Sequence, residues 1–327
     1  MIFIGKCPYR ISLLGGGSDL DWFVEDECFG NSIGFSLAKY SYTVINKKDK
    51  NSKIGMLNYS SRETYSEIDE IAHPLIRESL RYLKINNLIE MNSYGFASGG
   101  GGLGGSSSFC ISFLAALNKA FNLNIANKEL AHICSEIEIN ILGKPIGRQD
   151  QYISSLGGIN ALLYKPKGHV EILNLSKNHI EAIKLVSDEL ILIPSLRTRS
   201  ADKVLHNFKN SNKAKESLKD IRSICENFLK TNKSINELYD LLNHSIKESW
   251  EIKRKMSNVM DLELENQFNI INQIPNNWIR LIGAGSGGYF LLSSKVDINE
   301  ALSFLSNKDI KALKVELSKE GISACVV

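Results

Sequence analysis

The segment Ala97-Ser-Gly-Gly-Gly-Gly-Leu-Gly-Gly-Ser-Ser-Ser108 decides the fold, because six of the seven residues between Ser98 and Ser106 are glycine. A helical apolar repeat follows at once, with these residues four positions apart: Phe109, Phe113, Leu117 and Phe121. Glycine lets successive backbone N–H groups converge on an anion, and the N-terminus of the next helix adds unpaired donors. Residues 91–96, before the loop, are typical of a short strand. Strand, glycine loop and helix in this order predict a phosphate site.

Several known nucleotide loops fit this segment poorly. Gly100, Gly102 and Gly105 satisfy G-x-G-x-x-G, but the acidic residue that a dinucleotide site needs roughly 20 positions later is missing. A P-loop requires a lysine before the serines, and a protein kinase requires H-R-D and D-F-G sequences; neither pattern is present. A flexible surface linker is the remaining alternative, and the hydrophobic helix that follows argues against it.

Composition sets mild limits on function. The chain has 327 residues, 43% hydrophobic content and a formal net charge of +3. This length allows two hydrophobic cores, and the small positive excess favours neither nucleic acid nor a membrane as a partner. The one dense basic run, Lys253-Arg254-Lys255, is typical of a solvated helix face. Because no run of about 18 apolar residues and no signal-peptide pattern is present, we expect a cytoplasmic protein.

Strands and helices are expected to alternate along the chain. Residues 41–46, 53–57, 91–96, 159–164, 170–173, 190–193 and 278–282 are predicted as strands, and residues 74–88, 109–121, 128–142, 200–229, 235–257 and 261–273 as helices. No clear pattern appears in residues 174–188, which we interpret as a domain junction. The six cysteines are scattered without a C-x-x-C pair, which favours core positions over zinc or disulfides.

Two further glycine clusters accompany the first. Gly283-Ala-Gly-Ser-Gly-Gly288 joins two apolar segments, and alone it fits a plain hairpin as well as a functional loop. Near the N-terminus, Arg10-Ile-Ser-Leu-Leu-Gly-Gly-Gly-Ser-Asp19 ends a strand-like run in a glycine turn. Asp19 could cap the turn or hold sugar hydroxyls. Arg10 would need a buried anionic partner if it points inward.

Two carboxylates stand out in the middle of the chain. On the helix expected over residues 128–142, Glu138 lies at the margin of the apolar face and is therefore expected to be half-buried. It could be a surface glutamate paired with a lysine or a Mg²⁺ ligand. Asp150 begins a short helix, where an N-cap role would also explain it.

Taken together, these motifs resemble the GHMP kinases, and the match runs from Cys7 to Leu292. Within that superfamily, the combination of Arg10 to Asp19, Ile146-Gly-Arg-Gln-Asp-Gln-Tyr152 and Arg199-Ser-Ala201 looks most like the heptose 7-phosphate kinases. The resemblance implies an α+β protein of two domains: residues 1–178, similar to the ribosomal S5 domain 2-like fold and binding ATP, and residues 179–327, similar to a ferredoxin-like fold.

The resemblance also implies the residues of the site. ATP phosphates would be wrapped by Ser98, Gly99, Gly100, Gly101, Gly102, Leu103, Gly104, Gly105, Ser106, Ser107 and Ser108. Mg²⁺ would be held by Glu138 and by Ser106, with Ser107 as the alternative because Gly105 stands where the family has a serine. Asp150 matches the catalytic aspartate. The substrate would contact Arg10, Gly16, Gly17, Ser18, Asp19, Gln149, Asp150, Tyr152, Arg199, Gly285, Ser286 and Gly287.

The reaction implied is phosphoryl transfer from ATP to the C1 hydroxyl of D-glycero-D-manno-heptose 7-phosphate, which yields the 1,7-bisphosphate for GDP-heptose biosynthesis. Arg199, with Arg197 nearby, is expected to clamp the 7-phosphate, because a guanidinium binds phosphate bidentately. A GHMP kinase for another sugar, such as a fucokinase-like enzyme, and an inactive nucleotide-binding regulator are the alternatives. We expect a monomer or homodimer acting on small molecules.

Overall fold

A computed structural model describes residues 1–49, 51–96, 101–195, 211–256, 260–283 and 287–327. The first half comprises β1 (Ile2–Leu14), α1 (Asp21–Glu27), β2 (Gly30–Lys47), β3 (Gly55–Asn58), β4 (Arg62–Tyr65), the 3₁₀ turn Ile68–Glu70, α2 (Pro74–Tyr82), β5 (Ile89–Gly95), α3 (Gly105–Ala120), α4 (Asn127–Ser135), the π-helical turn Glu136–Ile141, α5 (Gln149–Leu156), β6 (Ile159–Lys165) and β7 (His169–Leu173). The second half comprises α6 (Lys177–Asp188), β8 (Leu190–Pro194), α8 (Asn212–Lys230), α9 (Ile235–Arg254), α10 (Leu262–Ile271), β9 (Asn276–Ile282), β10 (Tyr289–Ser294), α11 (Ile298–Ser306), β11 (Leu313–Lys314) and β12 (Ser323–Val326).

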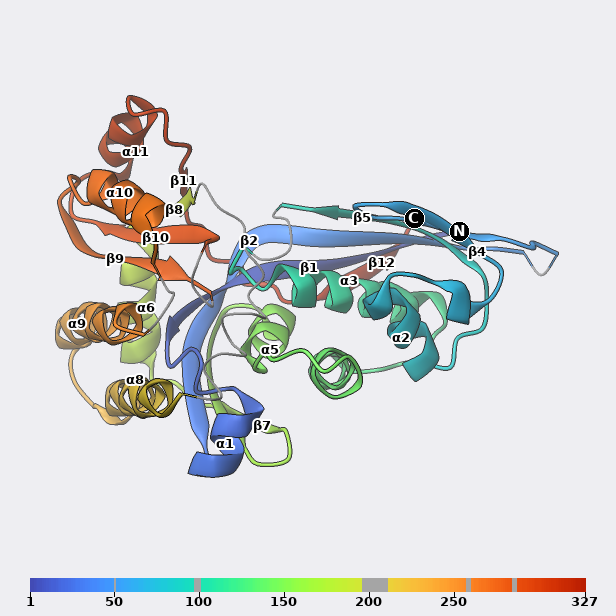
Figure 1. Ribbon diagram of the computed structural model, residues 1–327, viewed down its shortest axis with the longest axis horizontal. Helices are drawn as coiled ribbons and strands as arrows, with labels where there is room; N and C mark the ends of the chain where they lie inside the picture. The colour runs from blue at the N-terminus through green and yellow to red at the C-terminus, as the bar shows by residue number, and fades with distance from the viewer. Residues whose placement is uncertain (50, 97–100, 196–210, 257–259, 284–286) are drawn as a thin grey trace.

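A mixed sheet of eight strands forms the larger half of the molecule. Its main path runs β12-β1-β2-β5-β3-β4, and β6 and β7 continue from the other end of β2. The strand β2 is 18 residues long, so it can pair with β1, β5 and β6 in turn and extend through most of the molecule. Helices α2, α3 and α5 cover one face of this sheet (Figure 1).

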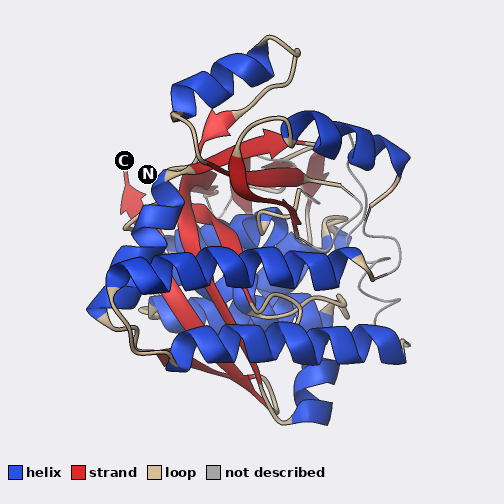
Figure 2. Cartoon of the chain, turned by 90° about the vertical axis from the view of Figure 1, so that its left-hand side faces the viewer, coloured by secondary structure: helices blue, strands red, loops and turns tan. Residues whose placement is uncertain are grey.

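The second sheet has four antiparallel strands in the order β11-β8-β10-β9. Numbered along the chain, these are the fourth, first, third and second strands of the sheet, with helices in the first and third connections, as in a ferredoxin-like fold. Two long helices, α8 and α9, lie side by side at this end of the molecule (Figure 2). The α+β fold class expected from the sequence is confirmed.

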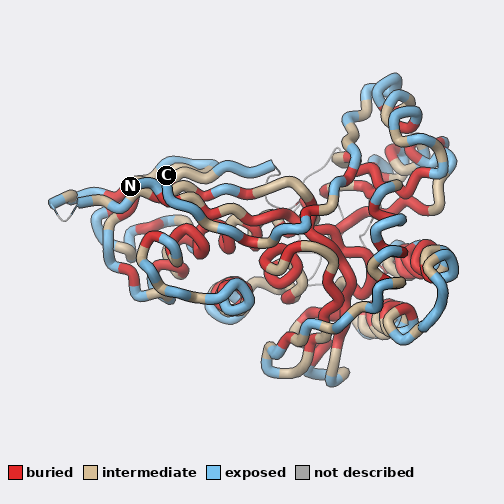
Figure 3. Tube along the Cα trace, turned by 180° about the vertical axis from the view of Figure 1, so that it is seen from behind, coloured by how far each residue is buried: buried red, intermediate tan, exposed pale blue. Residues whose placement is uncertain are grey.

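Both halves contribute to one hydrophobic cluster. It includes Ile11 and Phe35 from the large sheet together with Leu192, Phe228 and Leu242 from the second half. The buried segments in Figure 3 accordingly concentrate where the large sheet meets the second half. The expected division between residues 178 and 179 falls inside α6 and stays a prediction. Among the helices described, none combines the length and apolar content that crossing a bilayer requires.

The expectation that residues 174–188 have no regular secondary structure is wrong, whereas their role as a domain junction stays a prediction. Residues Lys177–Asp188 form α6, with Ser176 capping its N-terminus. The buried positions His179, Ala182, Ile183 and Val186 have helical spacing, which the polar residues between them obscure. The strands expected at residues 159–164 and 170–173 are confirmed as β6 and β7, which pair antiparallel as a hairpin.

A close crossing between β1 and α3 gives a test of this packing. A Cβ added at Gly5 would lie 1.9 Å from the Ser112 carbonyl oxygen and 2.8 Å from the Ala116 nitrogen, both backbone atoms that no rotamer change can move. We therefore expect Gly5→Ala to lower the free energy of unfolding by about 3 kcal/mol in urea titrations. Gly143→Ala is the matched control, since its Cβ meets open space and only its φ of 64° is unfavourable, at about 1 kcal/mol. Equal losses in the two variants would contradict the close crossing.

Candidate functional site

An arginine–aspartate pair links β1 to α5. Arg10 donates from Nε and Nη2 to the same oxygen, Oδ1 of Asp150, at 2.8 and 2.6 Å. Its third donor, Nη1, binds the carbonyl oxygen of Gly102 in the glycine loop. Arg10 is 4% exposed, so it points inward and has the anionic partner that the sequence analysis expected, although Asp150 itself is only half-buried. The alternative N-cap role of Asp150 is wrong, because Arg148 is the N-cap residue of α5.

The second oxygen of Asp150 is left available. Within the described part of the chain, nothing donates a hydrogen bond to Oδ2, and the Asp150 side chain is 23% exposed. A Cβ built on Gly104 would lie 3.4 Å from Oδ2, so this oxygen faces the point where the glycine loop enters α3. A carboxylate held at one oxygen and open at the other can orient a hydroxyl group and accept its proton.

The N-terminal glycine turn holds Asp19 against the start of α5. Asp19 accepts hydrogen bonds from the backbone N–H groups of Gly17, at 3.0 Å, and Gln149, at 3.1 Å. Burial raises the pKa of Asp19; the Gln149 hydrogen bond opposes that effect, and the nearby Asp150 charge adds to it. The Ser18 hydroxyl donates to the carbonyl oxygens of Gly15 and Asn31, which stabilises the turn.

Two buried polar atoms beside this turn have no hydrogen-bond partner in the described residues, Ser12 Oγ and Gln149 Oε1. A Cβ at Gly16 would lie 2.9 Å from Ser12 Oγ and 3.5 Å from Gln149 Nε2, so a larger residue would crowd both. An unpaired buried acceptor or hydroxyl is unfavourable and suits a polar ligand. The predicted residues Gly16, Gly17 and Gln149 therefore meet beside Asp19.

Tyr152 does not join this group. It lies two positions after Asp150 on α5, and residues two apart on a helix do not share a face. Its side chain packs in an apolar cluster with Val24, Ala131 and Val170. The hydroxyl of Ser108 likewise turns inward and donates to the carbonyl oxygen of Pro8 at 3.0 Å. These two side chains were predicted to contact ligands, and the structure places both in the core.

A fully buried carboxylate lies under the start of α3. One oxygen of Glu138, Oε1, accepts hydrogen bonds from Ser106 Oγ at 2.7 Å and Lys144 Nζ at 2.9 Å. The other, Oε2, accepts from Ser107 Oγ at 2.6 Å and Gln151 Nε2 at 2.8 Å. Burial by itself raises the pKa of Glu138, but the Lys144 charge and these hydrogen bonds outweigh it and hold the pKa below its usual value.

The expected half-burial of Glu138 is wrong, since the residue is 0% exposed. The physical reason is the π-helical turn Glu136–Ile141, in which the Leu142 N–H binds the carbonyl oxygen of Ile137, five residues back. Such a turn breaks the regular 100° spacing on which the sequence argument depended. Sequence reasoning also missed Lys144 and Gln151; no motif marks Lys144, whereas Gln151 directly follows Asp150.

The glycine loop lies against the second sheet. A Cβ on Gly102 would be 2.4 Å from the Ile282 carbonyl oxygen, and one on Gly288 would be 2.5 Å from the Gly101 carbonyl oxygen. Only glycine allows these two backbones to approach so closely. Gly283 and Gly288, from the cluster at residues 283–288, thus lie directly against Gly102 and Gly101 of the first glycine loop. Predicted site residues outside the described ranges are Ser98, Gly99, Gly100, Arg199, Gly285 and Ser286.

Comparison with known proteins agrees with this geometry. Residues 74–158 match the family described as the GHMP kinases N terminal domain, and these residues include the glycine loop, Glu138 and Asp150. The chain thus carries a GHMP kinase N-terminal domain over these residues. This chain is an ATP-dependent phosphotransferase, and its fold is that of the solved structures it resembles.

Three relatives illustrate the similarity. The chain is 24% identical over 296 residues to the D-glycero-alpha-D-manno-heptose 7-phosphate kinase of Campylobacter jejuni, covering 87% of each chain. A crystal structure of a D-glycero-D-manno-heptose 1-phosphate kinase from Bacteroides thetaiotaomicron matches with a TM-score of 0.74, 19% identity and 99% of both chains. Lactococcus lactis galactokinase complexed with galactose also matches with a TM-score of 0.74, at 14% identity, covering 98% of this chain and 95% of the galactokinase.

Two cationic side chains of the second half of the chain also lie in this region. Lys253, in the last turn of α9, donates to the carbonyl oxygen of Gly283. Arg280, in β9, donates from Nη1 to the carbonyl oxygen of Leu13 at 2.6 Å. Burial, followed by the charges of Arg280 and Arg10, lowers the pKa of Lys253 to about 7. The interpretation of residues 253–255 as a uniformly solvated face is wrong at Lys253, which is half-buried.

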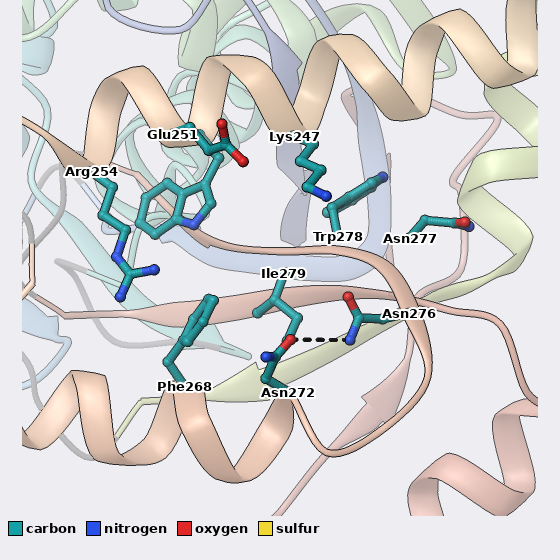
Figure 4. Close-up of a pocket in the computed structure, with 10 residues that line it drawn as sticks. Lys247, Glu251, Arg254, Phe268, Asn272, Asn276, Asn277, Trp278 and Ile279 are labelled. Carbon is teal, nitrogen blue, oxygen red and sulfur yellow. Dashed lines mark hydrogen bonds between the residues drawn. The ribbon is translucent and has the colours of Figure 1, made fainter.

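A separate cavity of about 410 Å³ lies between α9, α10 and β9 (Figure 4). Arg254 lies 4.7 Å from the ring centre of Phe268 at this cavity and pairs with Glu265. Asn272 and Asn276 are joined by a 3.4 Å hydrogen bond on its lower side. None of the residues that line it belongs to the group around Asp19, Asp150 and Glu138, so we do not assign the phosphotransfer to this cavity.

Proposed function

We propose that this kinase transfers the γ-phosphate of ATP to the C1 hydroxyl of D-glycero-D-manno-heptose 7-phosphate and so supplies the 1,7-bisphosphate for GDP-heptose biosynthesis in the cytoplasm. The observation that carries the reaction type is Asp150, whose Oδ1 is held by Arg10 while Oδ2 faces the glycine loop. The similarity to the Campylobacter jejuni heptose 7-phosphate kinase supports the choice of substrate.

In the proposed reaction, Asp150 Oδ2 accepts the proton of the C1 hydroxyl as its oxygen attacks the γ-phosphorus. A bond forms between that oxygen and phosphorus, the bond from phosphorus to the β–γ bridging oxygen breaks, and ADP leaves with the electron pair. Arg10 keeps the Asp150 carboxylate in position. Asp19, with the turn Gly16–Ser18, orients the sugar ring hydroxyls.

The phosphate groups of ATP fit the start of α3. Gly104 precedes the helix with φ of 72°, and the first N–H groups of α3 have no partner within the helix. Positioning of the two substrates and neutralisation of charge account for most of the catalysis in phosphoryl transfer.

The residues present also fit Mg²⁺. Ser106 Oγ and Glu138 Oε1 both bind the same cationic atom, Lys144 Nζ, at 2.8 and 2.9 Å. A hydroxyl and a carboxylate oxygen that already converge on one cation are suitable Mg²⁺ ligands, and nucleotide phosphates complete such sites. Ser106 is more exposed than Ser107, which supports Ser106 as the ligand. When bound, Mg²⁺ would neutralise charge on the phosphate oxygens.

The proposal is tested by measuring ADP release with Mg·ATP and a panel of acceptors: heptose 7-phosphate, heptose 1-phosphate, heptose, fucose, galactose and mevalonate. We expect turnover with heptose 7-phosphate and a product whose new phosphorus couples to the C1 proton in ³¹P NMR. Turnover only with an unphosphorylated sugar, or phosphorylation at C7 of heptose 1-phosphate, would retain the fold and overturn the substrate. ATP binding without turnover would favour an inactive regulator.

A further inference from the structure

Two cations of the second half lie in the site without a carboxylate partner. Arg280 is 6% exposed, and its Nε is a buried donor with no partner in the described residues. Apart from the carbonyl oxygen of Leu13, Arg280 has no hydrogen-bond acceptor within the described chain. Among the described residues, Lys253 Nζ binds a single acceptor, the carbonyl oxygen of Gly283. Within the described ranges, no carboxylate oxygen lies within 4.0 Å of either side chain.

Such an arrangement is unfavourable for the protein alone. Charged groups removed from water need an opposite charge, and without one their charged forms are destabilised. Burial and the Arg10 charge lower the pKa of Arg280 to about 10, and the pKa of Lys253 falls to about 7. The Asp19 charge acts in the opposite direction and raises the pKa of Lys253. The site therefore carries positive charge that an anionic ligand would compensate.

Backbone contacts place both cations beside the proposed sugar position. Leu13, which accepts from Arg280, comes two residues before the glycine turn that holds Asp19. Gly283, which accepts from Lys253, contacts Gly102, and Gly102 in turn accepts from Arg10. The cations thus contact segments next to the Asp19 turn and next to Arg10, the partner of Asp150.

We propose that Lys253 and Arg280 together bind the phosphate ester carried by the acceptor sugar. This inference rests on the proposed function, because it names the group that recognises the phosphate of a sugar phosphate. Arginine supplies a planar pair of donors for phosphate, and lysine supplies a compact charge. The γ-phosphate of ATP carries the same charged oxygens, so it is the alternative ligand for these two cations. We favour the acceptor because the N-terminus of α3 already serves the nucleotide and because Arg280 is anchored next to the Asp19 turn.

The test compares phosphorylated with unphosphorylated heptose as acceptors in Lys253→Met and Arg280→Lys. Lys255→Met is the matched control, since Lys255 is an exposed lysine two positions away. We expect the ratio of kcat/KM for heptose 7-phosphate to that for heptose to fall ~10–100-fold in Lys253→Met, as for loss of a hydrogen bond to a charged group. The lower ratio should result mainly from a higher KM for heptose 7-phosphate. The control Lys255→Met should keep the wild-type ratio. Arg280→Lys retains the charge of a buried residue, so it should fold and lose a smaller part of the preference.

Binding of the non-hydrolysable analogue AMP-PNP distinguishes whether the two cations bind the phosphate of the acceptor sugar or the γ-phosphate of ATP. An unchanged analogue Kd in Lys253→Met, with a lower preference for the phosphorylated sugar, supports the inference. A weaker analogue Kd with an unchanged preference would overturn it and assign the cations to the γ-phosphate. The wild-type enzyme tests the proposed function separately: if it shows no preference for the phosphorylated sugar, the proposed substrate is wrong whatever the variants do.

Discussion

Replacing Asp150 with asparagine should lower kcat by ~10²–10⁴-fold, the range typical for removal of a positioned general base. Asparagine has nearly the same shape and can still accept a hydrogen bond from Arg10 through its carbonyl oxygen, but it cannot take the proton of the sugar hydroxyl. Because the N-terminus of α3 would still bind the phosphates, the Kd of AMP-PNP should change little. Steady-state kinetics and a nucleotide-binding titration measure the two effects separately.

The asparagine variant is preferred to alanine for a structural reason. Arg10 is buried, and alanine would remove its carboxylate partner and leave an uncompensated charge, which destabilises a protein strongly. A thermal melt of Asp150→Asn measures any remaining loss of stability. Asp69→Asn is the matched variant, since Asp69 also pairs with an arginine, Arg81, but at the surface. If Asp150→Asn kept kcat within a few-fold of wild type while Asp69→Asn did the same, Asp150 would not be the base.

The parts of the site that could be predicted from sequence are local in the chain. The glycine loop before α3 combines a run of residues that allow unusual backbone angles with a helical apolar repeat, and both signals lie within about 25 residues. The hairpin of β9 and β10 follows the same logic, because two apolar segments flank a glycine cluster. Motifs of this kind can be identified before the fold is known, because glycine content and apolar spacing are properties of one short segment.

The remaining features depend on contacts between distant segments. Arg10 meets Asp150 across 140 positions of sequence, and Arg280 meets Leu13 across 267. The burial of Glu138 depends on the π-helical turn, and no residue pattern at positions 136–141 predicts that turn. Lys253 stands in a basic run of ordinary appearance, but it lies in the last turn of α9 and is half-buried, whereas Lys255 is the C-cap residue and is exposed. Periodicity describes one element at a time, and these residues acquire their surroundings from another element.

Glu138→Gln should have the second large effect, on both stability and metal binding. Removing the negative charge leaves the Lys144 ammonium beside Ser106 without its anionic partner, and breaking a buried ion pair in this way lowers the free energy of unfolding by about 3–5 kcal/mol. If Glu138 also holds Mg²⁺, the concentration of metal needed for half-maximal activity should rise. Urea unfolding measures the first effect, and Mn²⁺ binding by electron paramagnetic resonance, with AMP-PNP present, measures the second without turnover.

Lys144→Met separates the two roles of Glu138. It removes the cation and leaves the carboxylate with its hydrogen bonds from Ser106, Ser107 and Gln151. Since the ammonium binds the two oxygens that we assign to Mg²⁺, its loss should leave Mn²⁺ affinity equal or tighter, whereas Glu138→Gln should weaken that affinity. A Glu138→Gln variant that unfolds more readily and yet binds Mn²⁺ as the wild type does would show that the carboxylate only stabilises the start of α3, and would remove it from the metal site.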